Sequence, residues 1–181
     1  VSYNMYGFNQ GNILLNDLCN DNFDIIAVQE HWLGDSELSK ITQFHDSYHG
    51  YAWSAMYNKL SSGILVGRPF GGLGLLINKD LKINISCVSV QSSCRCCSVV
   101  LKFPSGFRIL FISVYFPCLN AGKDYENELL ECLGFIEDSI EHNSVDAVML
   151  AGDLNFEWHS DNIGSRLFSS FADDLNFKCC A

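Results

Sequence analysis

Two apolar segments, each the length of a β-strand, constrain the fold of this chain more than any other feature. They are FDIIAVQE at residues 23–30 and VDAVMLAGDLN at residues 145–155. Both are rich in Val, Ile and Leu and lack the apolar and polar alternation of a half-exposed strand. We therefore expect two buried strands, the first of them a central strand covered on both faces by other elements.

The remaining apolar patterns predict further strands and helices around these two. Strands are expected at residues 1–3, 51–55, 71–78, 83–90, 97–103 and 107–115, the last two joined by the turn PSG. Helices are expected at residues 12–20, 36–44, 124–142 and 165–177. In the first helix, Ile13 and Leu14 are expected to face the same way as Asp17 and Leu18. Strands with covering helices predict α/β layers.

Composition limits the class of protein. No repeat or linker divides the chain, so residues 1–181 are interpreted as one globular domain. The formal charge of −10 disfavours a polyanionic partner unless a metal ion or a local basic patch reverses the sign of the field. No apolar run approaches the length of a membrane span, which predicts a soluble protein with no membrane partner.

Cysteine usage predicts a reducing, intracellular environment. The nine cysteines are an odd number, and no signal peptide is recognised at the start of the sequence. The segment CRCC at residues 94–97 and the pair Cys179 and Cys180 lack the spacing and the partner histidines of a zinc site. We interpret these thiols as core and strand residues.

Both buried strands end in an acidic residue, Glu30 in one and Asp153 in the other. In layered α/β folds side chains leave the core at the strand ends, so these carboxylates are expected to meet at one rim. Carboxylates without histidine or cysteine partners favour Mg²⁺, which takes one or two of them and keeps waters for a substrate phosphate. Asn155 and Asn4 would add amides beside them.

Each of these residues also has a structural interpretation when taken alone. Asp153 and Asn155 form an ordinary turn pair after a strand, and Glu30 is a surface acid in a loop. Asn4 caps a strand or its turn, and Tyr115 is a packing group at the rim. Taken singly, the residues leave the choice between catalysis and structure open.

Five segments in a fixed order carry more information than any one of them. They are SYNMYGFNQG, FDIIAVQEHWL, GRPFGGLGLL, ILFISVYFPC and MLAGDLNFEW. The set resembles the endonuclease/exonuclease/phosphatase superfamily, which has the deoxyribonuclease-I-like fold. Within it, GRPFGGLGLL and the helix after GDLNF most resemble the apurinic-type endonuclease domain of LINE-type non-LTR retrotransposons. The resemblance implies a four-layer α/β/β/α sandwich.

The resemblance also implies an activity. Members hydrolyse phosphodiesters with a divalent metal, here Mg²⁺ with Mn²⁺ as the alternative ion. The implied partner is double-stranded DNA, nicked on one strand to leave a 3′ hydroxyl that primes reverse transcription. A reverse transcriptase domain would then lie downstream in the parent polyprotein, and the site of action would be nuclear.

Five residues of this sequence fall on the family's functional positions. Glu30 falls on the principal Mg²⁺ ligand, and Asn4 on the asparagine that supports the same metal and phosphate cluster. Tyr115 falls on the tyrosine that binds the scissile phosphate. Asp153 falls on the aspartate that handles the nucleophile or leaving group, and Asn155 on the asparagine that orients the phosphate.

Three features depart from the family's pattern. Tyr6 stands where apurinic endonucleases carry an acidic residue, and Cys118 stands where they carry a phosphate-contacting asparagine. The Ser-Asp-His motif that ends the family's pattern is not in this sequence. We therefore expect a domain that lacks its last strands at the C-terminus and is weakly active or inactive by itself.

Two other functions remain open. A phosphodiesterase or phosphatase of the same fold, acting on lipid or inositol phosphates, would suit the acidic charge. A decayed fragment that binds a partner without catalysis would suit the departures at Tyr6 and Cys118. Competition between plasmid DNA and a phospholipid substrate tests the first alternative, and a Mg²⁺-induced change in thermal stability tests the second.

Overall fold

The structure is a computed structural model that describes residues 1–56, 60–61, 64–65, 70–119 and 124–179. Residues 67–69, which begin the segment GRPFGGLGLL, lie outside the described residues, as does Cys180. None of the helices in the described part of the chain combines the length and the apolar character needed to cross a membrane.

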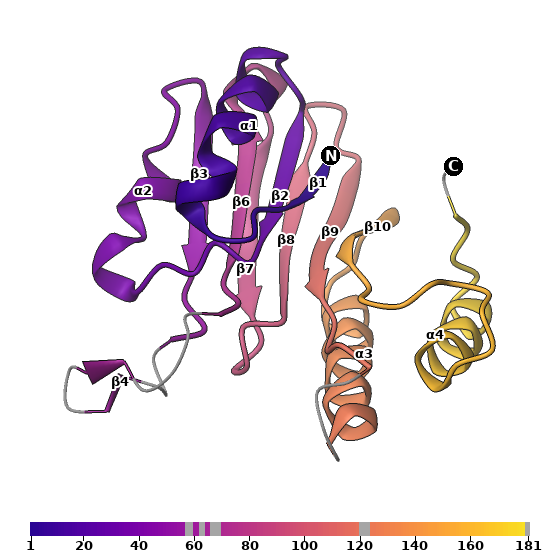
Figure 1. Ribbon diagram of the computed structural model, residues 1–181. Helices are drawn as coiled ribbons and strands as arrows, with labels where there is room; N and C mark the ends of the chain where they lie inside the picture. The colour runs from indigo at the N-terminus through magenta and orange to yellow at the C-terminus, as the bar shows by residue number, and fades with distance from the viewer. Residues whose placement is uncertain (57–59, 62–63, 66–69, 120–123, 180–181) are drawn as a thin grey trace.

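Two four-stranded sheets stand at the centre of the described structure (Figure 1). In the first sheet the strand order is β1 (Ser2–Asn4), β2 (Ile25–Gln29), β6 (Leu73–Asn78) and β3 (Tyr48–Trp53). In the second sheet the order is β10 (Ala147–Asp153), β9 (Arg108–Tyr115), β8 (Cys96–Lys102) and β7 (Asn84–Val90). A separate hairpin is formed by β4 (Leu60–Ser61) and β5 (Ile64–Leu65).

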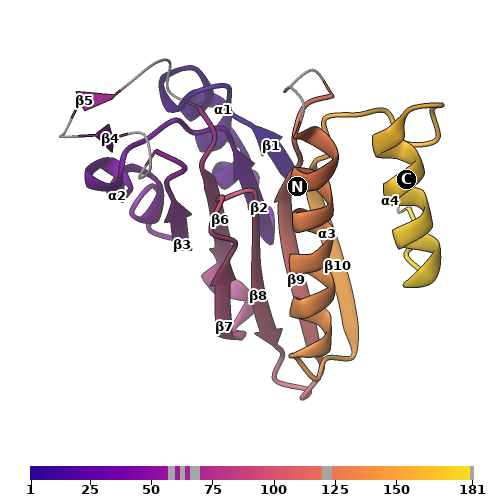
Figure 2. The ribbon, with the colours of Figure 1, turned by 90° about the horizontal axis from the view of Figure 1, so that it is seen from below.

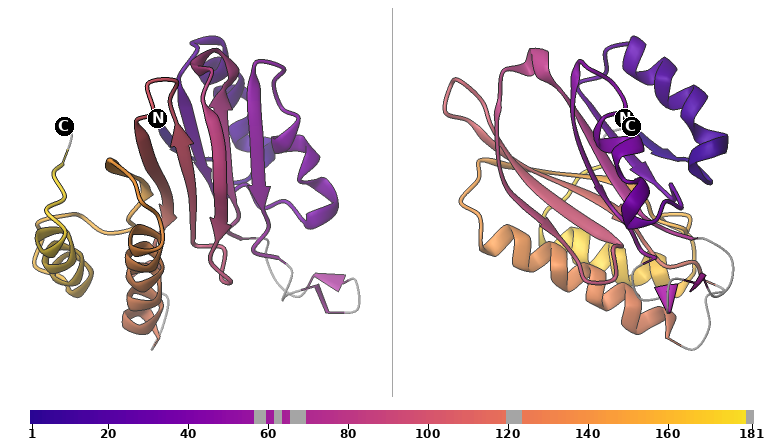
Figure 3. Two further views of the ribbon diagram at one scale, coloured as in Figure 1. Left: turned by 180° about the vertical axis from the view of Figure 1, so that it is seen from behind. Right: turned by 90° about the vertical axis from the view of Figure 1, so that its left-hand side faces the viewer.

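Helices cover the outer faces of the two sheets. The first sheet carries α1 (Phe8–Asn20) and α2 (Ser39–Thr42), and the second carries α3 (Tyr125–Glu141), beside which lies α4 (Ile163–Asp174). Two 3-10 turns, Asp35–Glu37 and Lys79–Leu81, complete the described helical elements. Figures 2 and 3 show α1 and α3 on opposite sides of the sheets. The predicted α/β/β/α order of layers is therefore confirmed.

Apolar side chains fill the three spaces between the four layers. Along β2, Ile26 and Val28 pack with the residues of α1, whereas Ala27 packs with residues of the second sheet. Between the sheets the buried residues are Ala27, Leu75, Ile77, Val99, Leu101 and Phe111. Because successive residues of β2 enter different cores, this strand is buried on both faces, as its sequence predicts.

The strand β10 corrects the prediction of a second buried strand, because none of its residues is fully buried. It pairs with β9 and lies at the edge of its sheet in the described structure. Met149, in the middle of β10, is 50% exposed. The apolar run predicts the strand correctly, but an apolar sequence does not by itself distinguish a central strand from an edge strand that has one neighbour.

Helix α1 buries a face that its apolar residues Ile13 and Leu14 do not mark. Its buried residues are Gly11, Leu15 and Cys19, spaced four apart, while Ile13 and Leu14 are 71% and 45% exposed. Gly11 lets the helix lie against the end of β1, since a Cβ there would meet Met5 Cβ at 2.7 Å. The face was missed because a glycine and a cysteine contribute two of its three buried positions. The helix predicted at 36–44 is divided into the 3-10 turn and α2.

Candidate active site

The parallel strand pairs bring the predicted site residues to one rim. Asn4 ends β1 beside Gln29 of β2, so that Glu30 follows immediately, and Asp153 ends β10 beside Tyr115 of β9. Parallel neighbours place their carboxyl ends at the same edge of a sheet. Both sheets therefore deliver polar side chains to the same region.

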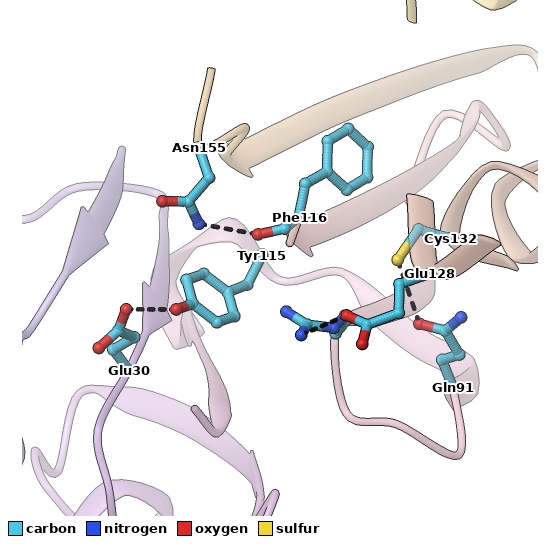
Figure 4. A network of polar contacts seen from close by, with 8 residues as sticks. Glu30, Gln91, Tyr115, Phe116, Glu128, Cys132 and Asn155 are labelled. Atoms are coloured by element: carbon cyan, nitrogen blue, oxygen red, sulfur yellow. Dashed lines mark hydrogen bonds and ion pairs between the residues drawn. The ribbon is translucent and has the colours of Figure 1, made fainter. Parts of the chain in front are cut away.

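Two hydrogen bonds connect the sheets at this rim. The Tyr115 hydroxyl donates to Glu30 Oε1, and Asn4 Nδ2 donates to Asp153 Oδ2 over 2.8 Å. Figure 4 shows the phenol of Tyr115 pointing toward the Glu30 carboxylate. Each bond pairs one residue of the first sheet with one of the second. The structure thus brings together four of the five residues predicted from the sequence.

Asn155, the fifth residue, orients the Asp153 carboxylate and the loop that follows β10. Its backbone N–H donates to Asp153 Oδ1 over 3.0 Å, and its Nδ2 donates to the Phe116 carbonyl over 2.8 Å (Figure 4). Both carboxylate oxygens of Asp153 thus accept a hydrogen bond, one from Asn155 and one from Asn4. The Asn4 amide contacts Asp153, and its Oδ1 accepts from the Tyr6 N–H over 3.0 Å.

The phenol of Tyr115 is kept protonated by its surroundings. Burial raises its pKa above the ordinary value, and the hydrogen bond to Glu30 and the charge of that carboxylate raise it further. A protonated phenol is a hydrogen-bond donor. Tyr115 can therefore donate to a carboxylate or a phosphate oxygen across the whole physiological pH range.

Glu30 and Asp153 act on a common neighbour, the thiol of Cys118. Burial raises the pKa of this thiol, and the charges of Glu30 and Asp153 raise it further. Cys118 is exposed and free of disulfide. The two carboxylates therefore concentrate negative charge at one place on the rim, which is an environment that favours a bound cation.

The backbone at this rim adopts conformations that side chains seldom occupy. Positive φ angles of 51°, 56°, 58° and 56° occur at Tyr6, Glu30, Trp32 and Asn155. Left-handed conformations of non-glycine residues cost free energy and gather at functional sites, where the surrounding fold maintains them. Four of the ten such residues in the described part of the chain lie at this rim.

Sequence reasoning missed Trp32 and Gln29. Trp32 Nε1 donates to Glu30 Oε2 over 2.9 Å, so both Glu30 oxygens are held. Gln29 is fully buried and joins the sheets, because its Oε1 accepts from Ser2 and its Nε2 donates to Ser113 over 3.3 Å. The sequence offered one signal for both residues, which is their position close to the acid that ends the strand. Gln29 directly precedes Glu30, and Trp32 follows it by two residues.

His31 has a structural position. Its Nδ1 accepts from the Leu33 N–H over 3.0 Å, and its Nε2 lies 3.1 Å from the Trp53 carbonyl oxygen. The side chain is fully buried, and burial lowers its pKa. The histidine next to Glu30 is therefore held by backbone groups of the fold.

The residues at the rim fit a Mg²⁺ ion. Two carboxylates, Glu30 and Asp153, lie beside amide groups of Asn4 and Asn155, and Mg²⁺ needs only one or two carboxylates in addition to waters. Within the described ranges, no three or more His, Cys, Asp or Glu residues gather as a metal-binding group. The donor set of hard oxygens thus suits Mg²⁺, with Glu30 as the residue that would hold it.

Comparison with known proteins identifies the family. Residues 1–175 match the model of the endonuclease/exonuclease/phosphatase family, so the chain belongs to this family. Its members are hydrolases of phosphate esters, as the family name states. No curated protein sequence matches the chain.

Several solved structures have the same fold as this chain. The catalytic domain of APE2 from Xenopus laevis is 15% identical, with a TM-score of 0.66 over 94% of this chain and 66% of that chain. The 3′ phosphatase NExo from Neisseria, bound to a product DNA hairpin, is 15% identical, with a TM-score of 0.64 over 95% and 69%. TDP2 from Caenorhabditis elegans is 18% identical, with a TM-score of 0.52 over 81% and 42%. This chain thus spans less than half of TDP2 and about two thirds of the other two.

Proposed function

We propose that this chain carries the site of a Mg²⁺-dependent nuclease that nicks one strand of double-stranded DNA. The supporting observation is the convergence of Glu30, Tyr115, Asn4 and Asp153 through two hydrogen bonds between the sheets. Such a site combines a metal-holding carboxylate, a phenol donor and a second, oriented carboxylate. These are the groups that phosphodiester hydrolysis requires.

Each residue has one task in the proposed reaction. Glu30 holds the metal ion, which when bound supplies neutralisation of the phosphate charge and stabilisation of the leaving oxygen. Tyr115 turns its hydroxyl from Glu30 to a phosphate oxygen of the substrate and donates to it. Asp153, fixed by Asn4 and Asn155, accepts the proton of the attacking water.

An aromatic pair beside Glu30, the exposed Tyr6 and the partly buried Trp32, favours a nucleic-acid substrate. The rings of Tyr6 and Trp32 lie 5.2 Å apart, and Tyr6 is 60% exposed. Aromatic side chains provide surfaces on which bases stack. The structural neighbour NExo was solved with a product DNA hairpin, which is consistent with DNA as the substrate of this fold. Tyr6 thus has a use in place of the acidic residue of apurinic endonucleases.

The finer assignment is to a LINE-type retrotransposon. It rests on the resemblance of the segment GRPFGGLGLL, of which residues 70–76 form the approach to β6 and the first part of that strand. In this proposal the nick leaves a 3′ hydroxyl, a downstream reverse transcriptase domain extends it, and the reaction takes place in the nucleus.

The proposal is tested by substrate competition. With Mg²⁺ present, the chain is expected to convert supercoiled plasmid to the nicked circle only slowly, as expected for a sequence without the Ser-Asp-His motif, and chelation by EDTA is expected to stop the reaction. The nicked product should be extended by a reverse transcriptase, since the extension requires a 3′ hydroxyl. Hydrolysis of an inositol phosphate or phospholipid in preference to plasmid would support the alternative phosphatase function and contradict the proposal.

A further inference from the structure

Arg95 lies against the ring of Tyr115, at the start of the neighbouring strand. The residue directly precedes β8, and its carbonyl accepts from the Tyr115 N–H over 2.7 Å. The guanidinium carbon of Arg95 lies 5.7 Å from the centroid of the Tyr115 ring. A guanidinium at this distance is attracted by the electron-rich face of an aromatic ring. The cation therefore restricts the orientations that the phenol can adopt.

The guanidinium is itself held by an acidic residue of α3. Arg95 Nη2 lies 2.7 Å from Glu128 Oε2, and Glu128 is in the first turn of the helix. The two side chains are 22% and 37% exposed, a range in which an ion pair contributes little to the stability of the fold. We therefore interpret the ion pair as a contact that fixes the position of the Arg95 guanidinium, and not as a source of stability for the protein.

A cavity of about 320 Å³ opens on this side of Tyr115, with Arg95 and Glu128 in its wall. The contacts run from Glu128 to Arg95, from Arg95 to the ring of Tyr115, and from the phenol to Glu30. Figure 4 shows Tyr115 with its hydroxyl directed to Glu30 and Glu128 drawn on the other side of the ring. The helix α3 is thereby connected to the candidate active site.

We propose that Arg95 is a positioning residue for Tyr115 and that Glu128 fixes Arg95 in its position over the phenol ring. This inference rests on the proposed nuclease function, in which the Tyr115 hydroxyl donates to a substrate phosphate. In this proposal Arg95 acts through its contact with the Tyr115 ring. The positive charge of Arg95 also interacts with the Tyr115 hydroxyl. It lowers the pKa of Tyr115, although burial and Glu30 raise this pKa by more.

A double-mutant cycle tests whether Arg95 acts through the phenol. Arg95→Met keeps the length of the side chain and removes the charge, and we expect kcat for plasmid nicking to fall about 10-fold with KM nearly unchanged. In a Tyr115→Phe background the same substitution is expected to change kcat less than about twofold, because the hydroxyl that it positions is absent. An equal loss in both backgrounds would overturn the proposal.

Conservative variants separate positioning from a general effect of charge. Glu128→Gln keeps the shape but loses the counter-ion, and kcat is expected to fall about threefold. Arg95→Lys should restore part of the activity lost in Arg95→Met, because an ammonium is also attracted by the ring but lacks the planar fork. The control is Arg166→Gln, which removes the exposed ion pair with Asp161 on the N-terminal side of α4. A loss of activity in this control equal to that in Glu128→Gln would contradict the proposal.

A measurement without catalysis distinguishes failure of this inference from failure of the proposed function. Ring-labelled tyrosine gives one NMR signal set for each of the seven tyrosines, and Tyr115→Phe identifies the set of Tyr115. Arg95→Met and Glu128→Gln are expected to shift the Tyr115 ring signals. Unshifted signals in both variants would overturn the positioning role, whereas shifted signals in a chain that does not nick DNA would overturn only the nuclease function.

Discussion

Glu30 combines a left-handed backbone conformation with a carboxylate whose two oxygens both accept a hydrogen bond. The φ angle of 56° turns the chain sharply at the end of β2, and the side chain is received by Tyr115 and Trp32. An acid held in this way is already oriented before a metal ion binds. At the scale of the single residue, the site is therefore preorganised by neighbours of both sheets.

At the residue scale, the buried position of His31 leads us to expect that the stability of the protein depends on pH. Burial lowers the pKa of His31 in the folded protein, so protonation favours the unfolded chain. The stabilisation is complete above the unfolded value of about 6.5 and is lost as the pH falls from there toward the folded pKa, by at most about 1.4 kcal/mol per pH unit. Urea unfolding at pH 7 and pH 5 measures the loss, which is expected to be smaller in His31→Asn. The exposed His49→Gln serves as the control, and an identical pH dependence in wild type and His31→Asn would contradict the account.

How much of the site could be predicted differs from residue to residue. Glu30 and Asp153 could be placed together because each ends an apolar strand, and parallel strands end at one rim. The contacts of Trp32 and Arg95 could not, since they depend on a left-handed turn and on the register of β8 against β9. Neither feature leaves a periodic signal in the sequence.

At the element scale, the close packing of β10 on β9 explains the glycine before Asp153. Gly152 has a φ of 150°, and a Cβ built there would lie 1.9 Å from the Val114 carbonyl oxygen. No side chain fits between the two strands at this point without moving the backbone. The glycine thus allows β10 to bring Asp153 beside Tyr115, and the pair GD is a requirement of strand packing as well as of chemistry.

We expect Gly152→Ala to lower the free energy of unfolding by more than about 2 kcal/mol, because overpacking against a backbone oxygen cannot be relieved by a rotamer change. Denaturant unfolding measures the change. The matched control is Gly134→Ala in α3, where a Cβ would meet no atom within 4 Å and helix propensity predicts a gain of about 0.5–1 kcal/mol. Equal stability of Gly152→Ala and wild type would show that the two strands are not packed in this way.

The residue ranges of the helices and strands were predicted better than the burial of their faces. The long helix at 124–142 and the strands β8 and β9 agree with the predicted ranges to within about two residues, because their apolar patterns are long and regular. The buried face of α1 was not predicted, because Gly11 carries no hydropathy signal, although the close approach to Met5 depends on it. The prediction that β10 is buried was wrong, because hydropathy does not report how many neighbours a strand has.

At the scale of the whole molecule, the site exists only where the two sheets meet. Asn4 and Asp153, which form one of the hydrogen bonds between the sheets, are 149 residues apart in the chain. The chain carries a net charge of −10, and its rim adds two neighbouring carboxylates. A bound cation would relieve this local charge and at the same time reverse the sign of the field that a DNA phosphate meets.

Binding of Mg²⁺ is therefore expected to stabilise the folded chain. A ligand that binds only the folded state raises its stability by mass action, by about 2.7 kcal/mol at a concentration 100 times its Kd. Thermal unfolding with and without millimolar Mg²⁺ should show a rise in Tm for the wild type and a much smaller rise for Glu30→Gln. Exposed acids elsewhere provide the control, and Glu37→Gln should respond to Mg²⁺ as the wild type does. A rise that is the same in Glu30→Gln and wild type would place the ion elsewhere.

The measurement that tests the central claim most directly is Mg²⁺-dependent nicking of supercoiled plasmid by the wild type, Glu30→Gln and Asp153→Asn at equal folded concentration. Both substitutions keep the size of the side chain and remove its charge. The account predicts slow but measurable nicking by the wild type and a further loss of about 10²–10⁴-fold in rate in each variant, because one loses the metal-holding group and the other the proton acceptor. Nicking by either variant at the rate of the wild type would contradict the assignment of this rim as the active site.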